Sequence, residues 1–323
     1  MRKILLSAVL LSIGIMTVNA QLIKSDFLAN YAVGDNLEKG SYANTTQGES
    51  TPLQANQWSL SGKTGENDQS SVSVSPKAAS PLVFSGYVDS DKNVAIDFLK
   101  LATGGRTTIY SLVNDNTYGA GTYYFSFLFK VTEASLTTAA EFFSLDGNYT
   151  GNAQRVRFSV KGIDETTYQI GLGDSGAAST LSGTYEYGKT YVAVIEVVLA
   201  GDGTGSSSLY INPNLSSAKP STASATSAIT GTALKAIRGV VIRQRSTLAA
   251  QLSGLRFAST WSDVLGQGTS SIETGTVDKG EIISSKYYTL KGVEVKNPGQ
   301  NTGVYIQKDT YENNSVVVSK VIK

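Results

Sequence analysis

The chain has 323 residues, of which 41% are hydrophobic and 16% are charged. A chain of this length and composition can bury a large core, which excludes a disordered polymer. The 27 lysines and arginines nearly balance the 26 aspartates and glutamates, so no long-range field favours nucleic acid, an anionic membrane or an acidic polymer.

The chain contains no histidine and no cysteine. Imidazole-dependent hydrolases, histidine-ligated metal sites and thiol nucleophiles are therefore excluded. Disulfides are excluded as well, so packing and hydrogen-bonded sheet alone must hold the fold.

The N-terminal segment has the layout of a secretory signal peptide. Two basic residues precede an apolar run over Ile4–Val18, which is too short to cross a bilayer comfortably, and small residues follow. We predict a signal peptide over residues 1–20, cleavage between Ala20 and Gln21, and a mature chain that first enters the periplasm.

Residues 21–265 alternate apolar and polar side chains between glycine, serine, threonine and asparagine, which predicts short β-strands. Tyr123–Val131 alternates clearly, and the nearly continuous apolar run Thr190–Leu199, interrupted only by Glu196, is expected in the middle of a sheet. No segment sustains a helical period, although Thr132–Phe143 could form a turn or two. Strands with one apolar face need an opposing layer, so we predict an all-β fold of two antiparallel sheets packed face to face.

Two polar segments punctuate this pattern. Ser216–Ser227 is low in complexity and is expected to be a long surface loop. The polar, glycine-bearing stretch over residues 266–275 is expected to be a linker to a second, smaller domain over residues 276–323. That last domain contains three alternating runs separated by turn residues, which predicts a small antiparallel unit. It could instead be a last hairpin of the main domain.

Three features of this C-terminal segment resemble the type A C-terminal sorting domain of the Bacteroidetes type IX secretion system. They are a Y-x-L-x-G element, a G-x-Y-hydrophobic element and a basic, β-prone terminus. The residues that carry them are Tyr288, Leu290 and Gly292, then Gly303 and Tyr305, and finally Lys320 and Lys323. The resemblance implies that the segment directs outer-membrane passage through the type IX machinery, so we expect a secreted or cell-surface protein.

The order of strands in the body resembles the concanavalin A-like lectin/glucanase sandwich, a jelly roll close to laminin-G-type modules. The segments that carry this resemblance are Tyr123–Val131, Arg155–Gly162, Thr190–Val197, Ser208–Pro213, Ile237–Arg243 and Leu255–Val264. They are structural strands and turns rather than catalytic signatures, so the resemblance implies a fold more than an activity.

Glucanases of the fold that this chain resembles carry several carboxylates at period-two spacing on one strand, and this sequence has no such run. The acidic pairs Glu66/Asp68 and Asp89/Asp91 lie among polar, turn-prone residues and are interpreted as solvated surface. We therefore expect a protein that is not an enzyme and assign no catalytic residue.

Two further sets of residues were weighed as sites. The pairs Arg155/Arg157 and Arg243/Arg245 have period-two spacing, which favours the solvated side of a strand over an anion site. No cofactor is predicted. Calcium is possible through oxygen ligands, with Asp89 and Asp91, or Asp146 near Asn148, as candidates, and no metal residue is assigned.

Glycan binding is the leading functional hypothesis, since a sugar can stack on an exposed aromatic ring flanked by polar groups. Tyrosines near predicted turns are candidates, although tyrosine is also common at the edges of any sandwich. They are Tyr110, Tyr118, Tyr149, Tyr185, Tyr187 and Tyr210. The alternatives are a glycoside hydrolase or polysaccharide lyase that uses carboxylate or tyrosine chemistry, and a structural module that binds protein through a broad sheet.

Overall fold

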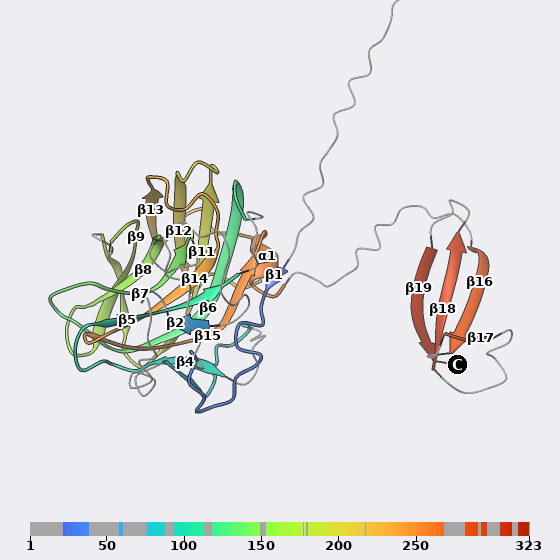
Figure 1. Cartoon of the computed structure of the whole chain (residues 1–323), viewed down its shortest axis with the longest axis horizontal. Coiled ribbons are helices and arrows are strands. Elements are labelled where there is room, and N and C mark those ends of the chain that lie inside the picture. Colours follow the sequence, from blue (N-terminus) through green and yellow to red (C-terminus); the bar gives the residue numbers. More distant parts are fainter. Residues whose placement is uncertain are drawn as a thin grey trace, which may run out of the picture. The chain divides into compact units, whose positions relative to one another are not determined.

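The computed structural model describes residues 22–38, 58–60, 76–87, 94–112, 118–148, 153–176, 178, 180–216, 218–267, 282–289, 292–295, 304–311 and 316–322. The chain divides into two compact units, Met1–Thr269 and Ser270–Lys323 (Figure 1). We call the described part of the first unit the body. Some predicted residues lie outside the described ones, namely Ala20, Gln21, Leu290, Gly303 and Lys323, together with the side chain of Lys320.

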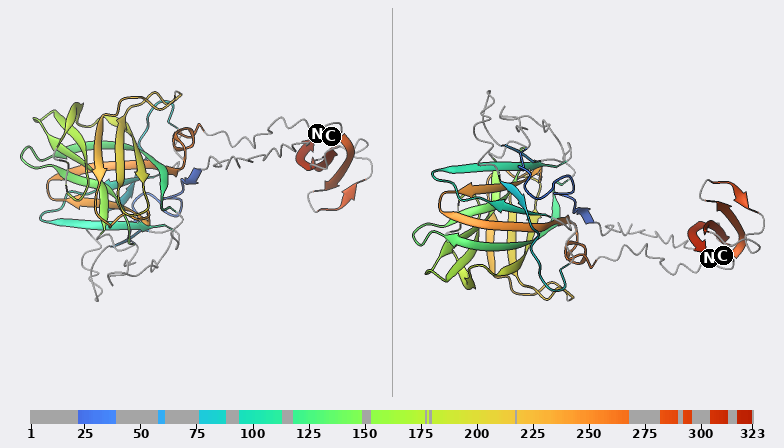
Figure 2. Two further views of the ribbon diagram at one scale, coloured as in Figure 1. Left: turned by 90° about the horizontal axis from the view of Figure 1, so that it is seen from above. Right: turned by 90° about the horizontal axis from the view of Figure 1, so that it is seen from below.

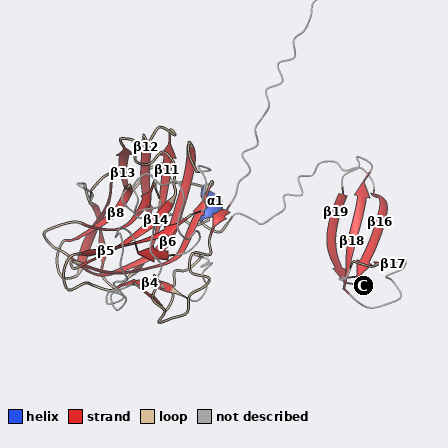
Figure 3. Ribbon diagram, viewed as in Figure 1, coloured by secondary structure: helices blue, strands red, loops and turns tan. Residues whose placement is uncertain are grey.

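The body consists of strands with one short helix among its described residues, which confirms the all-β fold class (Figure 3). All strand pairs are antiparallel. Sheet 1 has the order β10 (Ser182–Glu186), β9 (Thr167–Gly173), β8 (Gln154–Gly162), β7 (Ala140–Asp146), β14 (Gly239–Arg245), β5 (Gly105–Ser111) and β2 (Trp58–Leu60). Sheet 2 has the order β3 (Lys77–Ala79), β4 (Ala95–Phe98), β15 (Leu248–Ala258), β6 (Gly121–Ala134), β11 (Thr190–Leu199), β12 (Gly205–Ile211) and β13 (Ala225–Ile229), and β1 (Leu22–Lys24) also pairs with β15.

A single residue pair, Arg245 with Leu248, connects β14 to β15 and thereby links the two sheets in one hydrogen-bonded path. Figure 2 shows the strands of the body from two further sides. Because the connection is this narrow, the sheets are held together mainly by the side chains between them.

Phenylalanine side chains form the centre of that interior. Phe125, Phe127 and Phe129 of β6 are all 0% exposed, as the predicted alternation of this strand requires. The ring of Phe127 lies 4.7 Å from that of Phe143 on β7 and 5.8 Å from that of Phe158 on β8. These contacts cross from sheet 2 to sheet 1 and fix the two layers against each other.

A second apolar cluster covers the other face of sheet 2, which explains why β11 is apolar on both faces. It includes Val192 and Val194 of β11, Tyr87 and Trp261. Trp261 begins helix α1 (Trp261–Val264), whose first turn is capped by Thr260 Oγ1 accepting from the Asp263 backbone N–H at 3.2 Å.

The expected turn of helix at residues 132–143 is instead the end of β6 and the start of β7. Its alternation follows the sheet because Ala140 and the residues after it pair with β8. Among the described residues, no helix is long and apolar enough to span a membrane.

The pairing of β7 with β8 contains two irregularities close together. Phe142 is an extra residue on β7 between the pairs Glu141–Ser159 and Phe143–Phe158. Two residues of β8, Val156 and Arg157, stand opposite one residue of β7 before the next pair. Such bulges bend the strand and redirect its side chains.

The second unit is a four-stranded sheet in the order β17 (Glu294–Val295), β16 (Ile282–Thr289), β18 (Val304–Tyr311) and β19 (Val316–Ile322). Tyr288 of β16 is opposite Ile306 of β18. Gly292 has φ of 81° and its N–H donates to the Thr289 carbonyl oxygen at 2.9 Å, which makes the tight turn into β17. Tyr305 is 7% exposed.

Replacing Phe127 with alanine should destabilise the body by about 3–5 kcal/mol, because it leaves a cavity between the sheets. Urea unfolding followed by tryptophan fluorescence measures this change, since both tryptophans of the chain, Trp58 and Trp261, lie in the body. The control is Leu136→Ala on a side chain that is 53% exposed, where we expect a change within about 0.5 kcal/mol. Equal losses for the two variants would contradict the assignment of Phe127 to the core.

Candidate functional site

Three arginines surround one carboxylate on the face of sheet 1 that points away from the interior. Arg243 Nη1 donates to Glu141 Oε1 at 2.7 Å, Arg157 Nη1 donates to the same oxygen at 3.4 Å, and Arg245 Nη2 donates to it as well. We call Arg157, Arg243, Arg245 and Glu141 the arginine cluster. It forms because β8, β7 and β14 are neighbours in the sheet.

The arginine cluster is half-buried and carries more positive than negative charge. The side chain of Glu141 is 6% exposed, and those of Arg157, Arg243 and Arg245 are 15%, 27% and 25% exposed. Burial lowers the pKa of Arg157 and of Arg243, and the positive charge of Arg245 lowers that of Arg243 further. Three guanidinium groups share one carboxylate, so an anionic ligand would relieve their mutual repulsion.

Two guanidinium N–H groups of the cluster are unsatisfied. The Nε atoms of Arg157 and Arg243 are buried and have no hydrogen-bond partner in the described part of the chain. A buried donor without a partner costs about 1–3 kcal/mol, or more when charged, so these two groups add to the cost of holding the guanidinium groups here.

The backbone next to the cluster is strained. Val156, between Arg155 and Arg157, has φ of 56°, a conformation that β-branched residues rarely adopt. Strain of this kind costs about 1–3 kcal/mol and concentrates at functional sites. Together with the β7–β8 bulges it marks this stretch as a candidate site.

This finding changes the interpretation of the two arginine pairs. We expected Arg155/Arg157 and Arg243/Arg245 on the solvated sides of their strands, and their side chains are instead mostly buried. The structure brings three of the four together on Glu141. Arg155 lies further along, where its Nε is 3.3 Å from Asp174 Oδ1.

A second polar cluster lies on the outer face of sheet 2, around Glu196. Its carboxylate accepts from Tyr124 Oη at 3.0 Å, from Tyr210 Oη at 3.3 Å and from Lys219 Nζ. Burial, and after it the negative charge of Glu196, raises the pKa of both tyrosines, so the phenols remain protonated donors. One lysine balances one carboxylate here, which favours a structural role that anchors the loop carrying Lys219.

The tyrosines expected as sugar-stacking candidates are mostly packed into the body rather than exposed. Tyr110 contacts Phe27 and Trp58, whose indole N–H donates to the Phe27 carbonyl oxygen at 3.0 Å. Tyr110 and Tyr210 are buried. Tyr118, Tyr185 and Tyr187 are partly buried and pack against the core, and Tyr149 lies outside the described residues.

The calcium candidates do not converge in the described part of the chain. Asp146 is 0% exposed, and its two carboxylate oxygens accept from the backbone N–H groups of Asn148 at 3.1 Å and Ala153 at 2.9 Å. These bonds hold the turn between β7 and β8. Asp89 and Asp91 lie outside the described residues, as do Glu66 and Asp68.

No protein-family model matches the chain, and no curated protein matches it significantly. Solved structures similar to it include an alginate lyase in complex with an alginate trisaccharide, at 14% identity and a TM-score of 0.35, covering 53% of this chain and 83% of that one. An endo-β-1,4-glucuronan lyase from the fungus Trichoderma reesei is 11% identical with a TM-score of 0.37, covering 71% and 96%. The globular domain of T. cruzi calreticulin is 12% identical with a TM-score of 0.37, covering 65% and 86%.

These identities and scores transfer no activity or residue role to this chain. They do correct our expectation that the protein is not an enzyme, because two of these similar structures are polysaccharide lyases. The expectation came from the missing histidine, cysteine and glucanase strand. Such an inventory excludes only mechanisms that need those groups, and leaves arginine, lysine, tyrosine and carboxylate chemistry open.

Replacing Glu141 with glutamine should destabilise the body by about 3–5 kcal/mol, because three half-buried guanidinium groups lose their counter-charge. Sulfate should restore more of the melting temperature in the variant than in the parent chain, by occupying the cluster. Thermal unfolding in chloride and in sulfate at equal ionic strength measures both effects. Glu133→Gln, whose side chain is 54% exposed, serves as the matched control, and an identical response in the two variants would count against an anion-accepting cluster.

Proposed function

We propose that the protein is a polysaccharide lyase that acts on an acidic glycan, and that the arginine cluster binds a carboxylate of the polymer. The observation that carries this proposal is the convergence of three guanidinium groups on the single carboxylate of Glu141. Arginine suits this role because its planar fork binds carboxylates through two parallel hydrogen bonds.

The exposure of the cluster supports substrate binding rather than a closed structural network. About a quarter of each of the Arg243 and Arg245 side chains reaches solvent, while the carboxylate beneath them is almost fully covered. A substrate carboxylate approaching this face therefore meets guanidinium groups first. Water exclusion around the half-buried groups strengthens the interaction.

The chemistry that this arrangement favours is β-elimination. In a uronate, the C5 proton lies next to the carboxylate, and its removal places negative charge on that group. Guanidinium groups bound to the carboxylate stabilise this charge. In this reaction a base takes the C5 proton, the C4–O4 bond breaks with its electron pair on oxygen, the leaving oxygen takes a proton from water or from the protonated base, and a C4–C5 double bond forms. The arginine cluster supplies the charge stabilisation in this step, and we assign the base to no residue.

Turnover is measured as the ultraviolet absorbance of the C4–C5 double bond, with alginate, glucuronan and polygalacturonate as substrates and a neutral glucan as control. Replacing Arg243 with alanine should lower kcat/KM about 10²–10³-fold, as expected for loss of one charge-stabilising donor. Arg243→Lys keeps the charge but loses the fork, so it should recover only part of the loss.

Lys189→Ala, in the turn between β10 and β11 and with a side chain that is 57% exposed, should leave the rate unchanged. Absence of double-bond formation with every acidic polymer, from a folded protein, would refute the lyase. Equal activity of the parent chain and the Arg243 variants would refute the role of the cluster.

We further propose that the protein acts outside the cell, exported by its N-terminal signal peptide and passed through the outer membrane by its C-terminal unit. The support is the sequence pattern at both ends, with Tyr288, Gly292 and Tyr305 placed in the strands and turn of a separate small sheet. The type IX machinery would be the partner of that unit.

Removing residues 270–323 should leave the body folded and retain it in the periplasm of a Bacteroidetes host. Fractionation and surface labelling measure this, and a Gly176→Ala variant of the full chain, which changes a glycine with open space around it, is the control. Secretion of the truncated chain at the control level would rule out the sorting role.

A further inference from the structure

A cavity of about 360 Å³ lies where the β7–β8 turn meets the segment before β14. Its lining includes Gly147, Asn148 and Ala153 from the turn, and Lys235 and Arg238 from the segment. Ligand pockets range from about 300 to 1,000 Å³, so this one has room for a single sugar residue rather than a long chain.

The described residues that line the cavity include two cationic side chains. They are Lys235 and Arg238, and none of the described lining residues is acidic. The nearby carboxylate of Asp146 accepts backbone N–H groups of the β7–β8 turn, and the Arg238 N–H donates to the Asp146 carbonyl oxygen at 2.8 Å. Backbone bonds thus hold both sides of the cavity in place, and the two cationic side chains line it.

The cavity wall depends on a glycine. A Cβ at position 147 would stand 1.9 Å from the Ala233 carbonyl oxygen, so the turn and the segment touch there. Any larger residue at position 147 must push them apart, which alters the cavity.

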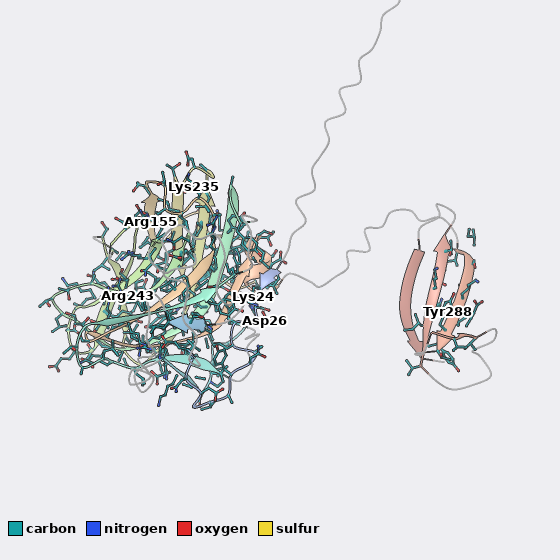
Figure 4. The ribbon with its side chains drawn as sticks, in the orientation of Figure 1. Lys24, Asp26, Arg155, Lys235, Arg243 and Tyr288 are labelled. Atoms are coloured by element: carbon teal, nitrogen blue, oxygen red, sulfur yellow. The ribbon has the colours of Figure 1, made fainter. Side chains whose placement is uncertain are left out.

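The cavity adjoins the arginine-bearing face of sheet 1. Arg155 Nε donates to the Thr230 carbonyl oxygen at 3.4 Å, and a Cβ at Gly231 would lie 3.7 Å from Arg155 Nη2. Thr232, the next residue, lines the cavity. Arg155, which is paired with Asp174, therefore stands along the chain between Ala153 of the cavity lining and Arg157 of the cluster. Figure 4 labels Arg155, Lys235 and Arg243.

We propose that this cavity is a second subsite, which binds the anionic group of another sugar residue of the polymer held at the arginine cluster. The inference rests on the proposed function and narrows the substrate to a polymer with negative charge on more than one sugar residue. Carboxylates and sulfates share the required chemistry, since both accept charge-assisted hydrogen bonds from Lys235 and Arg238.

Calorimetry measures the binding of four ligands. They are a uronate monosaccharide, a short and a long uronate oligomer, and a sulfated oligomer of a neutral sugar. Lys235→Gln and Arg238→Gln should each lower the affinity for the long uronate oligomer about 10-fold or more, as expected for loss of a charged hydrogen bond. Neither variant should change the affinity for the monosaccharide. Arg243→Ala should lower the affinity for both the monosaccharide and the long uronate oligomer. Tighter binding of the sulfated than of the uronate oligomer would identify sulfate as the preferred group.

Gly147→Ala should reproduce the loss for the long oligomer, with Gly176→Ala as the control that meets open space. Unchanged long-oligomer affinity in Lys235→Gln and Arg238→Gln, while Arg243→Ala still weakens it, would overturn the second subsite and leave the proposed function intact. Unchanged affinity in all three variants would overturn both.

Discussion

The contacts of Phe127 and Phe129 with the β7–β8 hairpin are the constraint on which the rest of the body depends. Without cysteine, no disulfide joins the two sheets, and in the described part of the chain their strands pair at a single residue pair. Aromatic packing therefore sets the distance and angle between the layers. It also fixes the hairpin that carries Glu141 and Arg157, because Phe143 and Phe158 of the same strands form the other half of the packing.

The β7–β8 hairpin places phenylalanine side chains in the core and charged side chains on the outer face of sheet 1. These two requirements account for its bulges. Phe142 and Phe143 are consecutive, and both are 0% exposed and belong to the core. In a regular strand, consecutive side chains point to opposite faces, so two consecutive core residues require a bulge. Phe142 is the extra residue on β7, which lets Phe142 and Phe143 both enter the core. On β8 the strained Val156 lies in the second bulge, and Glu141 and Arg157 meet on the outer face.

The fold was predictable from sequence because it follows local periodicity. The alternation of Tyr123–Val131 corresponds to β6, and the continuous apolar run Thr190–Leu199 is β11, which lies between two neighbours and is covered on both faces. The arginine cluster was not predictable in this way. Glu141 and Arg243 are far apart in sequence, and their contact depends on β7 and β14 being neighbours, which periodicity does not specify. The bulge was hidden as well, since valine gives no signal for positive φ.

The overall charge balance of the chain did not reveal the local excess of positive charge at the arginine cluster. The near balance of acidic and basic residues describes the whole chain, whereas a ligand responds to the charges within about 8–10 Å of it, the screening length at physiological salt. Glu196 with Lys219, and Glu38 with Arg106, each pair one carboxylate with a cation, and such pairs offset the cost of burying each other. Glu141 has three such partners. Two of those positive charges have no counterpart within the cluster, and holding them half-buried costs stability that a structural role would not require. An anionic ligand would supply the missing charge, which is the physical reason to propose this cluster, and not the balanced ones, as the site.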